Sequence, residues 1–277
     1  MTIQWYPGHM TKARRNIAEA MPSHDVVIEV LDARMPHASE NPVIRELRGS
    51  KPCVKVLAKA DLADPEATRL WLELLDDPDH SVRALAVSQS RGAEARARIA
   101  EACGALAKPT RGRTTARAMV VGIPNVGKST LLNTLALRAV ARVGDEPAVT
   151  KAVQVVTLQN GMVLSDNPGI LWPRMEDQGD TMRLGFGGAF PDVTLDFESV
   201  ALFGAGLLLE RYPGLLAQRY KLATMPADAA ALLVAIGRRR GCLRAGGAVD
   251  RHKASDILIH DFRNGSLGRI TLERPAG

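Results

Sequence analysis

The octapeptide Gly-Ile-Pro-Asn-Val-Gly-Lys-Ser at residues 122–129 constrains the fold of this chain more than any other feature. It follows an apolar run, Ala118–Val121, and leads into residues with the apolar spacing of a helix. A glycine-rich turn between a strand and a helix directs backbone N–H groups and the positive end of the helix dipole at a phosphate. A plain glycine-rich turn is disfavoured because both flanking elements are present. The octapeptide therefore predicts a phosphate-binding loop.

The polar positions of this loop have expected tasks. Lys128 would bridge the β- and γ-phosphates of a nucleotide, and the Ser129 hydroxyl would ligate Mg²⁺. The expected nucleotide contacts in this region are Asn125, Val126, Gly127, Lys128, Ser129 and Thr130.

Strands and helices alternate along the earlier part of the chain. Apolar, β-branched runs predict strands at Asp25–Leu31, Cys53–Leu57, Val82–Val87, Ala118–Gly122, Val153–Leu158 and Met162–Ser165. Helical patterns lie between them at Pro65–Leu75, Ala93–Leu106 and Lys128–Leu137. After about Trp172 the patterns are helical, at Phe197–Leu209, Pro213–Tyr220, Ala227–Arg239 and Arg251–Phe262, with a short strand at Arg269–Leu272. This order predicts an α/β domain with a mostly parallel sheet over residues 1–175 and a smaller, mostly helical domain over residues 176–277.

Composition excludes several classes of protein. The three cysteines, Cys53, Cys103 and Cys242, form no CxxC pair, which argues against a zinc site or a disulfide framework and favours a reducing compartment. The N-terminus has no apolar core of signal-peptide length. The longest apolar stretch, Ala201–Leu209, is far shorter than the ~20 residues that span a bilayer. We therefore expect a cytoplasmic protein with no membrane partner.

The positive charge is concentrated at the C-terminal end. The net charge is +6, and nine basic residues but four acidic residues follow Leu233. A basic cluster favours contact with the phosphate backbone of RNA, whereas the alternative is a solvated helix face. Only one aromatic residue follows Leu233, so structured RNA fits better than single strands read by stacking. The expected RNA contacts are Arg238, Arg239, Arg240, Arg244, Arg251 and Lys253, with Arg263 and Arg269 extending the surface.

A second motif, Asp166-Asn-Pro-Gly169, ends the strand predicted at Met162–Ser165. By itself this motif is only a turn. At ~40 residues after a phosphate loop, however, its carboxylate is placed to reach Mg²⁺ and the Gly169 N–H to meet the γ-phosphate. Thr150, in the loop-like stretch between the two motifs, is the expected second hydroxyl ligand of Mg²⁺.

A third motif, Ala58-Lys59-Ala60-Asp61, ends the strand predicted at Cys53–Leu57. It resembles the NKxD motif of GTPases, whose Asp accepts hydrogen bonds from guanine N1 and N2 and whose Lys packs on the base. That motif normally follows the phosphate loop, but here it precedes the loop. The resulting order of motifs is that of the circularly permuted GTPases.

Other segments resemble the ribosome biogenesis GTPase A (YlqF) family over nearly the whole chain. They are Trp5-Tyr-Pro-Gly-His9-Met10, Asp32-Ala-Arg-Met-Pro36 with Asn41-Pro42, and the closing segment Asp261–Leu272. The resemblance implies a circularly permuted P-loop GTPase domain followed by a helical domain that contacts rRNA. It further implies hydrolysis of GTP to GDP and phosphate on the precursor of the large ribosomal subunit, late in assembly. We expect the protein to act as a monomer.

Three features depart from the GTPase pattern. Ala58 replaces the Asn of NKxD, which removes an amide that would contact guanine and brace the phosphate loop, and losing such a bond costs ~1–3 kcal/mol. Ile170 and Leu171 stand where Ras-like enzymes place a Gln that orients the attacking water. The last guanine-side loop has no clean counterpart, and Ser88 and Gln89 are assigned to it.

Catalytic help is therefore expected from elsewhere. The resemblance points to His9, an imidazole that folding or docking would bring to the attacking water. It also points to Asn125, because a similar Asn coordinates K⁺ beside the phosphates in some permuted and assembly GTPases, where the cation stabilises developing charge. The alternatives are an inert N-terminal histidine and an asparagine that caps its own loop.

Two other functions remain open. The degraded guanine motif is consistent with an RNA-binding assembly factor that binds nucleotide with little turnover, although the intact Lys128, Ser129, Thr150 and Asp166 argue against it. A small-molecule kinase would share the phosphate loop. The chain has no acceptor-binding signature for such a kinase, and its basic C-terminal end would have no role there.

Overall fold

The computed structural model describes residues 8–108, 112–136, 154–158, 161–172, 175, 177–191 and 196–275. It contains a six-stranded sheet in the order β3-β2-β1-β4-β6-β5. The strands are β1 (Val26–Asp32), β2 (Cys53–Ala58), β3 (Val82–Ala86), β4 (Arg117–Gly122), β5 (Gln154–Thr157) and β6 (Val163–Asp166). All neighbouring strands are parallel except β5 and β6, which are antiparallel. The predicted α/β fold with a mostly parallel sheet is confirmed.

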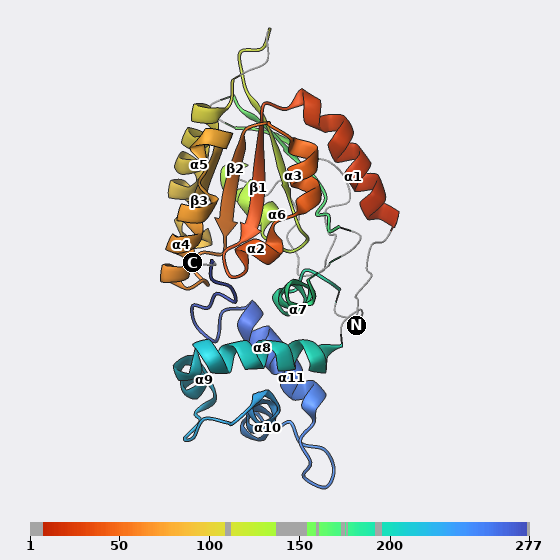
Figure 1. Cartoon of the computed structure of the whole chain (residues 1–277), viewed down its shortest axis with the longest axis vertical. Coiled ribbons are helices and arrows are strands. Elements are labelled where there is room, and N and C mark those ends of the chain that lie inside the picture. The colour runs from red at the N-terminus through yellow and green to blue at the C-terminus, as the bar shows by residue number, and fades with distance from the viewer. Residues whose placement is uncertain are drawn as a thin grey trace.

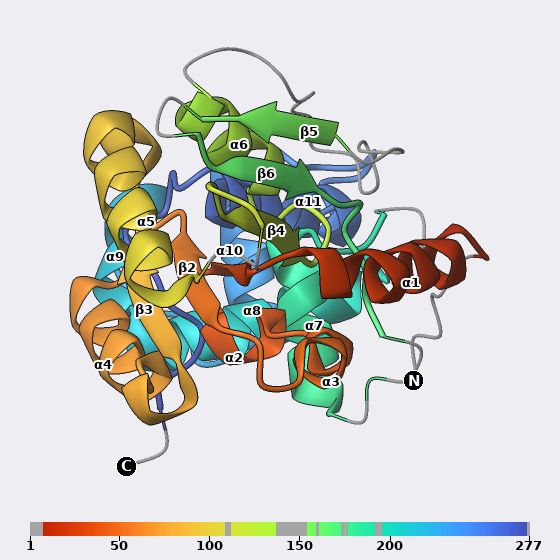
Figure 2. The same ribbon diagram turned by 90° about the horizontal axis from the view of Figure 1, so that it is seen from above.

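Helices cover both faces of the sheet (Figure 2). Even-numbered residues of β1 pack with α5 and α6, and odd-numbered residues pack on the other face with α1, α3 and α4. These helices are α1 (Gly8–Ala20), α3 (Pro42–Arg48), α4 (Pro65–Leu75), α5 (Gly92–Leu106) and α6 (Lys128–Ala136). Because both faces are covered, every residue of β1 is buried. A strand that is buried on both faces has a continuous apolar sequence, and this is why the strand could be predicted.

The C-terminal part of the chain is helical. It contains α7 (Gln178–Gly187), α8 (Phe197–Arg211), α9 (Pro213–Tyr220), α10 (Ala229–Arg239) and α11 (Arg251–Arg263). A second hydrophobic core lies among these helices, and within it the Phe186 and Phe262 rings have centroids 4.6 Å apart. Helices α8–α11 lie beyond the edge of the sheet where the parallel strands end (Figure 1). That edge carries the motifs found in the sequence, and it is where open α/β sheets bind ligands.

Several elements differ from the prediction. Helices α1, α3 and α7 were not expected from the sequence, because their apolar residues are few or interrupted by glycine. The strand predicted at Arg269–Leu272 is absent from the described structure. The backbone N–H groups of Ile270 and Leu272 donate instead to the carbonyls of Leu62 and Arg34, which lie in separate loops, so no strand ladder forms.

None of the described helices is by itself long and apolar enough to cross a membrane. Helices α8 and α9 reach that length and composition only as a pair, and the chain bends by 111° between them.

Candidate nucleotide-binding site

The predicted phosphate loop lies between β4 and α6. Gly122 has a φ of +147°, and a Cβ there would lie 2.5 Å from the carbonyl oxygen of Val30 on β1. Gly127 has a φ of +109°. Both positions therefore require glycine. The loop ends in the first turn of α6, whose N–H groups have no partner within the helix and can bind an anion.

Lys128 is the first residue of α6, and its side chain is buried inside the loop. Its Nζ donates to the carbonyl of Ile123 at 2.6 Å. Burial lowers the pKa of this amine to about 8, although the charge of Asp166 opposes the shift. Phosphate oxygens would stabilise the charged amine, so this placement suits the predicted contact with the β- and γ-phosphates.

Asp166 is the last residue of β6, and both of its carboxylate oxygens are buried without a hydrogen bond to a described residue. Burial raises the pKa of this carboxyl to about 6 against the opposing charge of Lys128. A buried carboxylate without donors is costly unless a cation meets it. Mg²⁺ takes carboxylate, hydroxyl and phosphate oxygens, so Asp166 and the Ser129 hydroxyl on α6 fit that ion. Thr150, the other predicted ligand, lies outside the described residues.

The described residues contain no group of three or more His, Cys, Asp or Glu side chains that could hold a metal ion. A Mg²⁺ ion at Asp166 would therefore depend on hydroxyl and phosphate oxygens for its other ligands, as in other phosphate-loop sites.

Gly169 packs tightly against the phosphate loop. A Cβ at this position would lie 2.8 Å from the Lys128 Nζ and 2.8 Å from the backbone nitrogen of Pro124. Only glycine fits here without displacing the lysine. The predicted contact between the Gly169 N–H and a γ-phosphate is therefore compatible with its position beside Lys128.

The peptide after Gly169 is fixed from two sides. The Ile170 N–H donates to the carbonyl of Gly122 at 3.3 Å, and the Ile170 carbonyl accepts from the Asn41 side-chain amide at 2.8 Å. Sequence reasoning assigned Asn41 no role beyond its part in a family motif. Ile170 and Leu171 are fully buried, so neither side chain can contact a water at the phosphates.

A small pocket joins the guanine-side residues to the phosphate loop. Its lining includes the predicted residues Lys59, Ser88, Gly127 and Thr130, and the complete lining is Ala58, Lys59, Val87, Ser88, Ala95, Gly127, Thr130, Leu131 and Thr134. A Cβ on Gly127 would lie 3.4 Å from the Ala58 methyl. An asparagine at position 58 would therefore reach the loop, as the NKxD comparison requires.

Asp61 lies in the turn after β2, where its side chain is exposed and makes no hydrogen bond to a described residue. Gln89 begins the short helix η3 (Gln89–Arg91), but its side chain lies outside what the structure describes. His9 is the second residue of α1, and its side chain likewise lies outside the description.

Lys59 belongs to a buried ion-pair network. Its Nζ donates at 2.8 Å both to Asp32 and to the backbone carbonyl of Asn125. The Arg34 guanidinium donates two hydrogen bonds, of 2.9 and 2.8 Å, to the same carboxylate. It also donates at 3.1 Å to the carbonyl of Phe262, near the end of α11. Burial alone would raise the pKa of Asp32, but the charges of Arg34 and Lys59 hold it well below its usual range. Sequence reasoning missed this network, although the Asp-Ala-Arg-Met-Pro motif marked two of its members.

Asn125 links the phosphate loop to the helical part of the chain. It has a φ of +56°, and its side-chain amide donates to the carbonyl of Gly188, the residue that caps α7, at 2.8 Å. The side-chain amide therefore binds the C-terminal end of a neighbouring helix, and the predicted K⁺ contact of Asn125 stays a prediction.

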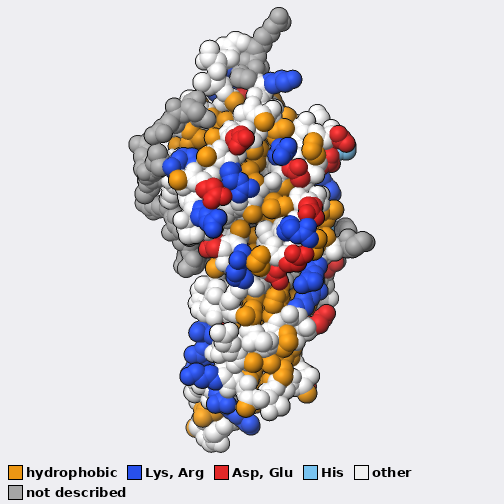
Figure 3. Space-filling view, turned by 90° about the vertical axis from the view of Figure 1, so that its left-hand side faces the viewer, with side chains coloured by type: hydrophobic (Ala, Val, Ile, Leu, Met, Phe, Trp, Pro, Cys, Tyr) orange, Lys and Arg blue, Asp and Glu red, His pale blue; other side chains and the backbone are white. Residues whose placement is uncertain are grey.

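The basic residues expected to contact RNA are all exposed, and Lys and Arg side chains follow one edge of the helical part (Figure 3). Three of them also form ion pairs: Arg240 with Asp261, Arg244 with Asp250 and Arg251 with Glu198. Of the two residues expected to extend this surface, Arg263 is half-buried and Arg269 is exposed, and their contact with RNA stays a prediction. Both guanidinium groups donate to backbone carbonyls, at residues 185 and 186 for Arg263 and at residues 60 and 63 for Arg269.

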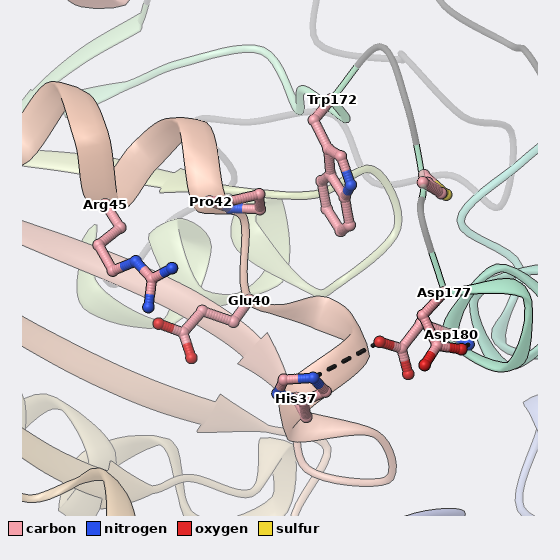
Figure 4. Close-up of a pocket in the computed structure, with 8 residues that line it drawn as sticks. His37, Glu40, Pro42, Arg45, Trp172, Asp177 and Asp180 are labelled. Carbon is pink, nitrogen blue, oxygen red and sulfur yellow. Dashed lines mark hydrogen bonds and ion pairs between the residues drawn. The ribbon is translucent and has the colours of Figure 1, made fainter.

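A second pocket, of about 370 Å³, opens beside the segment that follows the Asp166–Gly169 turn (Figure 4). Its lining is His37, Glu40, Pro42, Arg45, Trp172, Met175, Asp177 and Asp180. The His37 Nε2 lies 3.5 Å from Asp180, and Glu40 pairs with Lys55 at 2.9 Å. No phosphate-loop residue lines this pocket, so we assign it no part in nucleotide binding.

Taken together, the sheet, the phosphate loop and the earlier guanine-side turn define a P-loop GTPase whose motifs occur in permuted order. The family described as 50S ribosome-binding GTPase matches residues 117–201, which include the phosphate loop. The chain is 42% identical to ribosome biogenesis GTPase A of Bacillus cereus over 283 residues, covering 99% of this chain and 95% of the relative. This chain belongs to the ribosome biogenesis GTPase A family, as its motifs predicted.

Two further comparisons agree. The chain is 32% identical to mitochondrial ribosome-associated GTPase 1 of Mus musculus, covering 98% of this chain and 90% of the relative. It also matches the crystal structure of GNP-bound YlqF from T. maritima with a TM-score of 0.67 and 26% identity, over 95% of this chain and 98% of that one. The predicted fold and family are confirmed across nearly the whole length.

Proposed function

We propose that this chain hydrolyses GTP to GDP and phosphate while it is docked on the precursor of the large ribosomal subunit, late in assembly. The observation that carries the proposal is the pocket shared by Lys59, Ser88, Gly127 and Thr130. A base-reading turn and a phosphate loop that are far apart in the sequence meet there, and a guanine nucleotide needs both.

Each part of the site has a task in this reaction. Lys59 packs on the base while Asp61 accepts hydrogen bonds from guanine N1 and N2. Lys128 and the loop N–H groups hold the phosphates, and the Gly169 N–H meets the γ-phosphate. Mg²⁺, when bound, offsets the charge that develops on the phosphate oxygens. Its protein ligands are Ser129, Thr150 and Asp166.

Hydrolysis also needs a group that orients the attacking water. Ile170 and Leu171 are buried, which leaves this task to a residue from elsewhere in the chain. We assign it to His9, which docking on the particle would bring to the attacking water, so hydrolysis by the free protein is slow. A K⁺ ion beside Asn125 is the second candidate for stabilising the transition state.

The exposed basic residues of α10, α11 and the loop between them contact rRNA through its phosphates. The presence of a second hydrophobic core among α8–α11 supports an RNA-contacting unit over residues 176–277, beside a GTPase domain over residues 1–175. We propose that the protein works in the cytoplasm as a monomer.

A nucleotide titration tests this proposal. GTP and GDP should bind while ATP binds much more weakly, because Asp61 accepts from groups that adenine lacks. Phosphate release should accelerate when large subunits are added, and small subunits serve as the control. Repeating the assay in K⁺ and in Na⁺ separates the cation from His9. ATP binding as tight as GTP binding would contradict the base-reading role of Asp61.

Ala58 favours a second candidate function, an assembly factor that binds nucleotide with little turnover. The methyl group lines the base pocket where an amide would brace the phosphate loop. The two candidates differ in one measurement, multiple-turnover phosphate release on large subunits. Tight guanine-nucleotide binding without that release would favour the second candidate.

A further inference from the structure

The turn that carries Asp61 is held by the segment that follows α11. Arg269 donates from Nε to the carbonyl of Ala63 at 2.9 Å and from Nη2 to the carbonyl of Ala60 at 3.2 Å. The Ile270 N–H donates to the carbonyl of Leu62 at 2.9 Å. Two consecutive residues of the C-terminal segment thus bind three carbonyls within residues 60–63.

The same segment contacts both sides of this turn. Gly265 packs on the Leu62 side chain so closely that a Cβ on the glycine would lie 2.6 Å from a Leu62 methyl. Thr271 accepts a hydrogen bond from the Asp64 N–H at 3.1 Å and donates to the carbonyl of Ala33 at 3.3 Å. The C-terminal segment therefore contacts Ala60, Leu62, Ala63 and Asp64, on both sides of Asp61.

Ala63 is buried against Leu57 and Trp71, and Ala60 packs on the same cluster, but the turn has few other hydrogen bonds. Its backbone makes one internal hydrogen bond, from Leu62 to Lys59, and one bond to the residue after β3, from Ala60 to Val87. The Asp61 carboxylate is exposed and has no hydrogen bond to a described residue. Its direction thus depends on the backbone of the turn, and Arg269 and Ile270 supply three of the hydrogen bonds that hold this backbone.

We propose that Arg269 is a positioning residue that aligns the Asp61 carboxylate with the guanine edge, so that guanine selectivity depends on the C-terminal segment. This inference rests on the proposed role of Asp61. Arginine suits the task because its planar, rigid fork of N–H groups can span two carbonyls, whereas a lysine ammonium is a single point on a flexible stem. Arg269 is exposed, so its replacement leaves no buried cavity or charge.

The exocyclic amino group of guanine provides a specific readout. Asp61 would accept from both N1 and N2 of guanine but only from N1 of hypoxanthine, which lacks the amino group. A carboxylate that is out of alignment loses the second hydrogen bond first. The ratio of GDP affinity to IDP affinity therefore reports the alignment of Asp61, whereas a general loss of structure weakens both nucleotides equally.

The test compares the full chain with Arg269→Ala, Arg269→Lys and the matched control Arg274→Ala. Arg274 is an exposed arginine of the same segment and makes no hydrogen bond to the turn. Affinities for GDP, IDP and ADP are measured by competition with a fluorescent nucleotide. Thermal unfolding and hydrolysis at saturating GTP are measured alongside.

Arg269→Ala should weaken GDP by about tenfold and IDP by less than about threefold, the scale of one hydrogen bond. Arg269→Lys should lie between the alanine variant and wild type, and Arg274→Ala should match wild type. The rate at saturating GTP should not change, because the phosphate side of the site is untouched.

An unchanged ratio of GDP to IDP affinity in Arg269→Ala would overturn the inference while leaving the proposed function intact. Equal weakening of both nucleotides with a lower melting temperature would assign Arg269 a purely structural role and would also overturn it. If wild type fails to prefer GDP over ADP, the guanine assignment of Asp61 fails, and the inference fails with it.

Discussion

The Lys59 amine lies 2.8 Å from the Asp32 carboxylate, which places the lysine of the guanine motif on a buried anion. Arg34 binds the same carboxylate and reaches the end of α11. Buried charges of this kind are stable only together, because each loses its hydration on folding. The position of Lys59 therefore depends on a residue of the helical part as well as on β2, which Lys59 follows.

Replacing Asp32 should show this dependence. Asp32→Asn leaves Arg34 and Lys59 buried without their counter-charge, so we expect a loss of about 3–5 kcal/mol in unfolding free energy, measured in urea. The Asp32 pKa is depressed in the fold, so its contribution is complete above the unfolded pKa of about 4 and is lost as pH falls. The gap between variant and wild type should shrink below about pH 4. Asp256→Asn is the control, because this half-exposed carboxylate on α11 pairs with the exposed His260, and its loss should cost little.

Asp166→Asn should have the opposite effect on stability. Burial raises the pKa of Asp166 to about 6, so ionising it costs the nucleotide-free protein about 3 kcal/mol above that pH. The variant should be more stable than wild type at pH 8 and equal to it below about pH 4, while losing its Mg²⁺-dependent nucleotide binding. Urea unfolding across this pH range checks the sign. A variant less stable than wild type at pH 8 would show that Asp166 stabilises the fold.

Ala58→Asn should tighten GTP binding. The added amide can contact guanine and reach the phosphate loop beside Gly127, and such a bond contributes ~1–3 kcal/mol, or about tenfold or more in affinity. Ala58→Val fills similar space without an amide and should not tighten binding. Titration with GTP and ATP measures both variants. Equal affinities for wild type and Ala58→Asn would mean that the pocket has adapted to the alanine.

The strands and the phosphate loop could be predicted because their information is local. Buried parallel strands are continuous apolar runs, and α4 was located to the residue because Pro65 follows Asp64, whose side chain caps the helix. In α7, by contrast, Gly187 packs on Met35, and this contact with a distant residue helps hold a helix that its sequence does not favour.

The ion-pair network and the Asn41 contact could not be predicted for a related reason. Arg34 binds the carbonyl of Phe262, and Asn41 binds the carbonyl of Ile170. Every residue has a backbone carbonyl, so the sequence does not indicate which carbonyl accepts a hydrogen bond from a given side chain. The motif around Arg34 indicates that this arginine has a function, but only the fold identifies the carbonyl that it binds.

The double variant Arg238→Ala, Arg239→Ala tests the RNA surface. Both side chains are exposed at the end of α10, and neither holds the guanine-side turn. Association with large subunits should weaken, and the slope of log affinity against log salt should fall by about one for each phosphate that the variant no longer neutralises. GTP affinity should not change. Arg83→Ala, at an exposed arginine on β3, is the control. Truncation after Leu233 is a poorer test, because it also removes Arg269.

His9→Ala tests the source of the catalytic group. Ile170 and Leu171 are buried, so the attacking water needs a partner from another segment, and His9 lies in the N-terminal motif as the second residue of α1. Orientation of water by one group contributes ~10²–10⁴-fold to the rate. We expect the variant to lose most of the hydrolysis stimulated by large subunits while GTP affinity stays the same, because the imidazole acts on the transition state.

Thr11→Ala, an exposed neighbour on α1, should keep the stimulated rate. Equal stimulated rates for His9→Ala and wild type at saturating GTP would transfer the role to a cation beside Asn125, and the rate should then depend on K⁺.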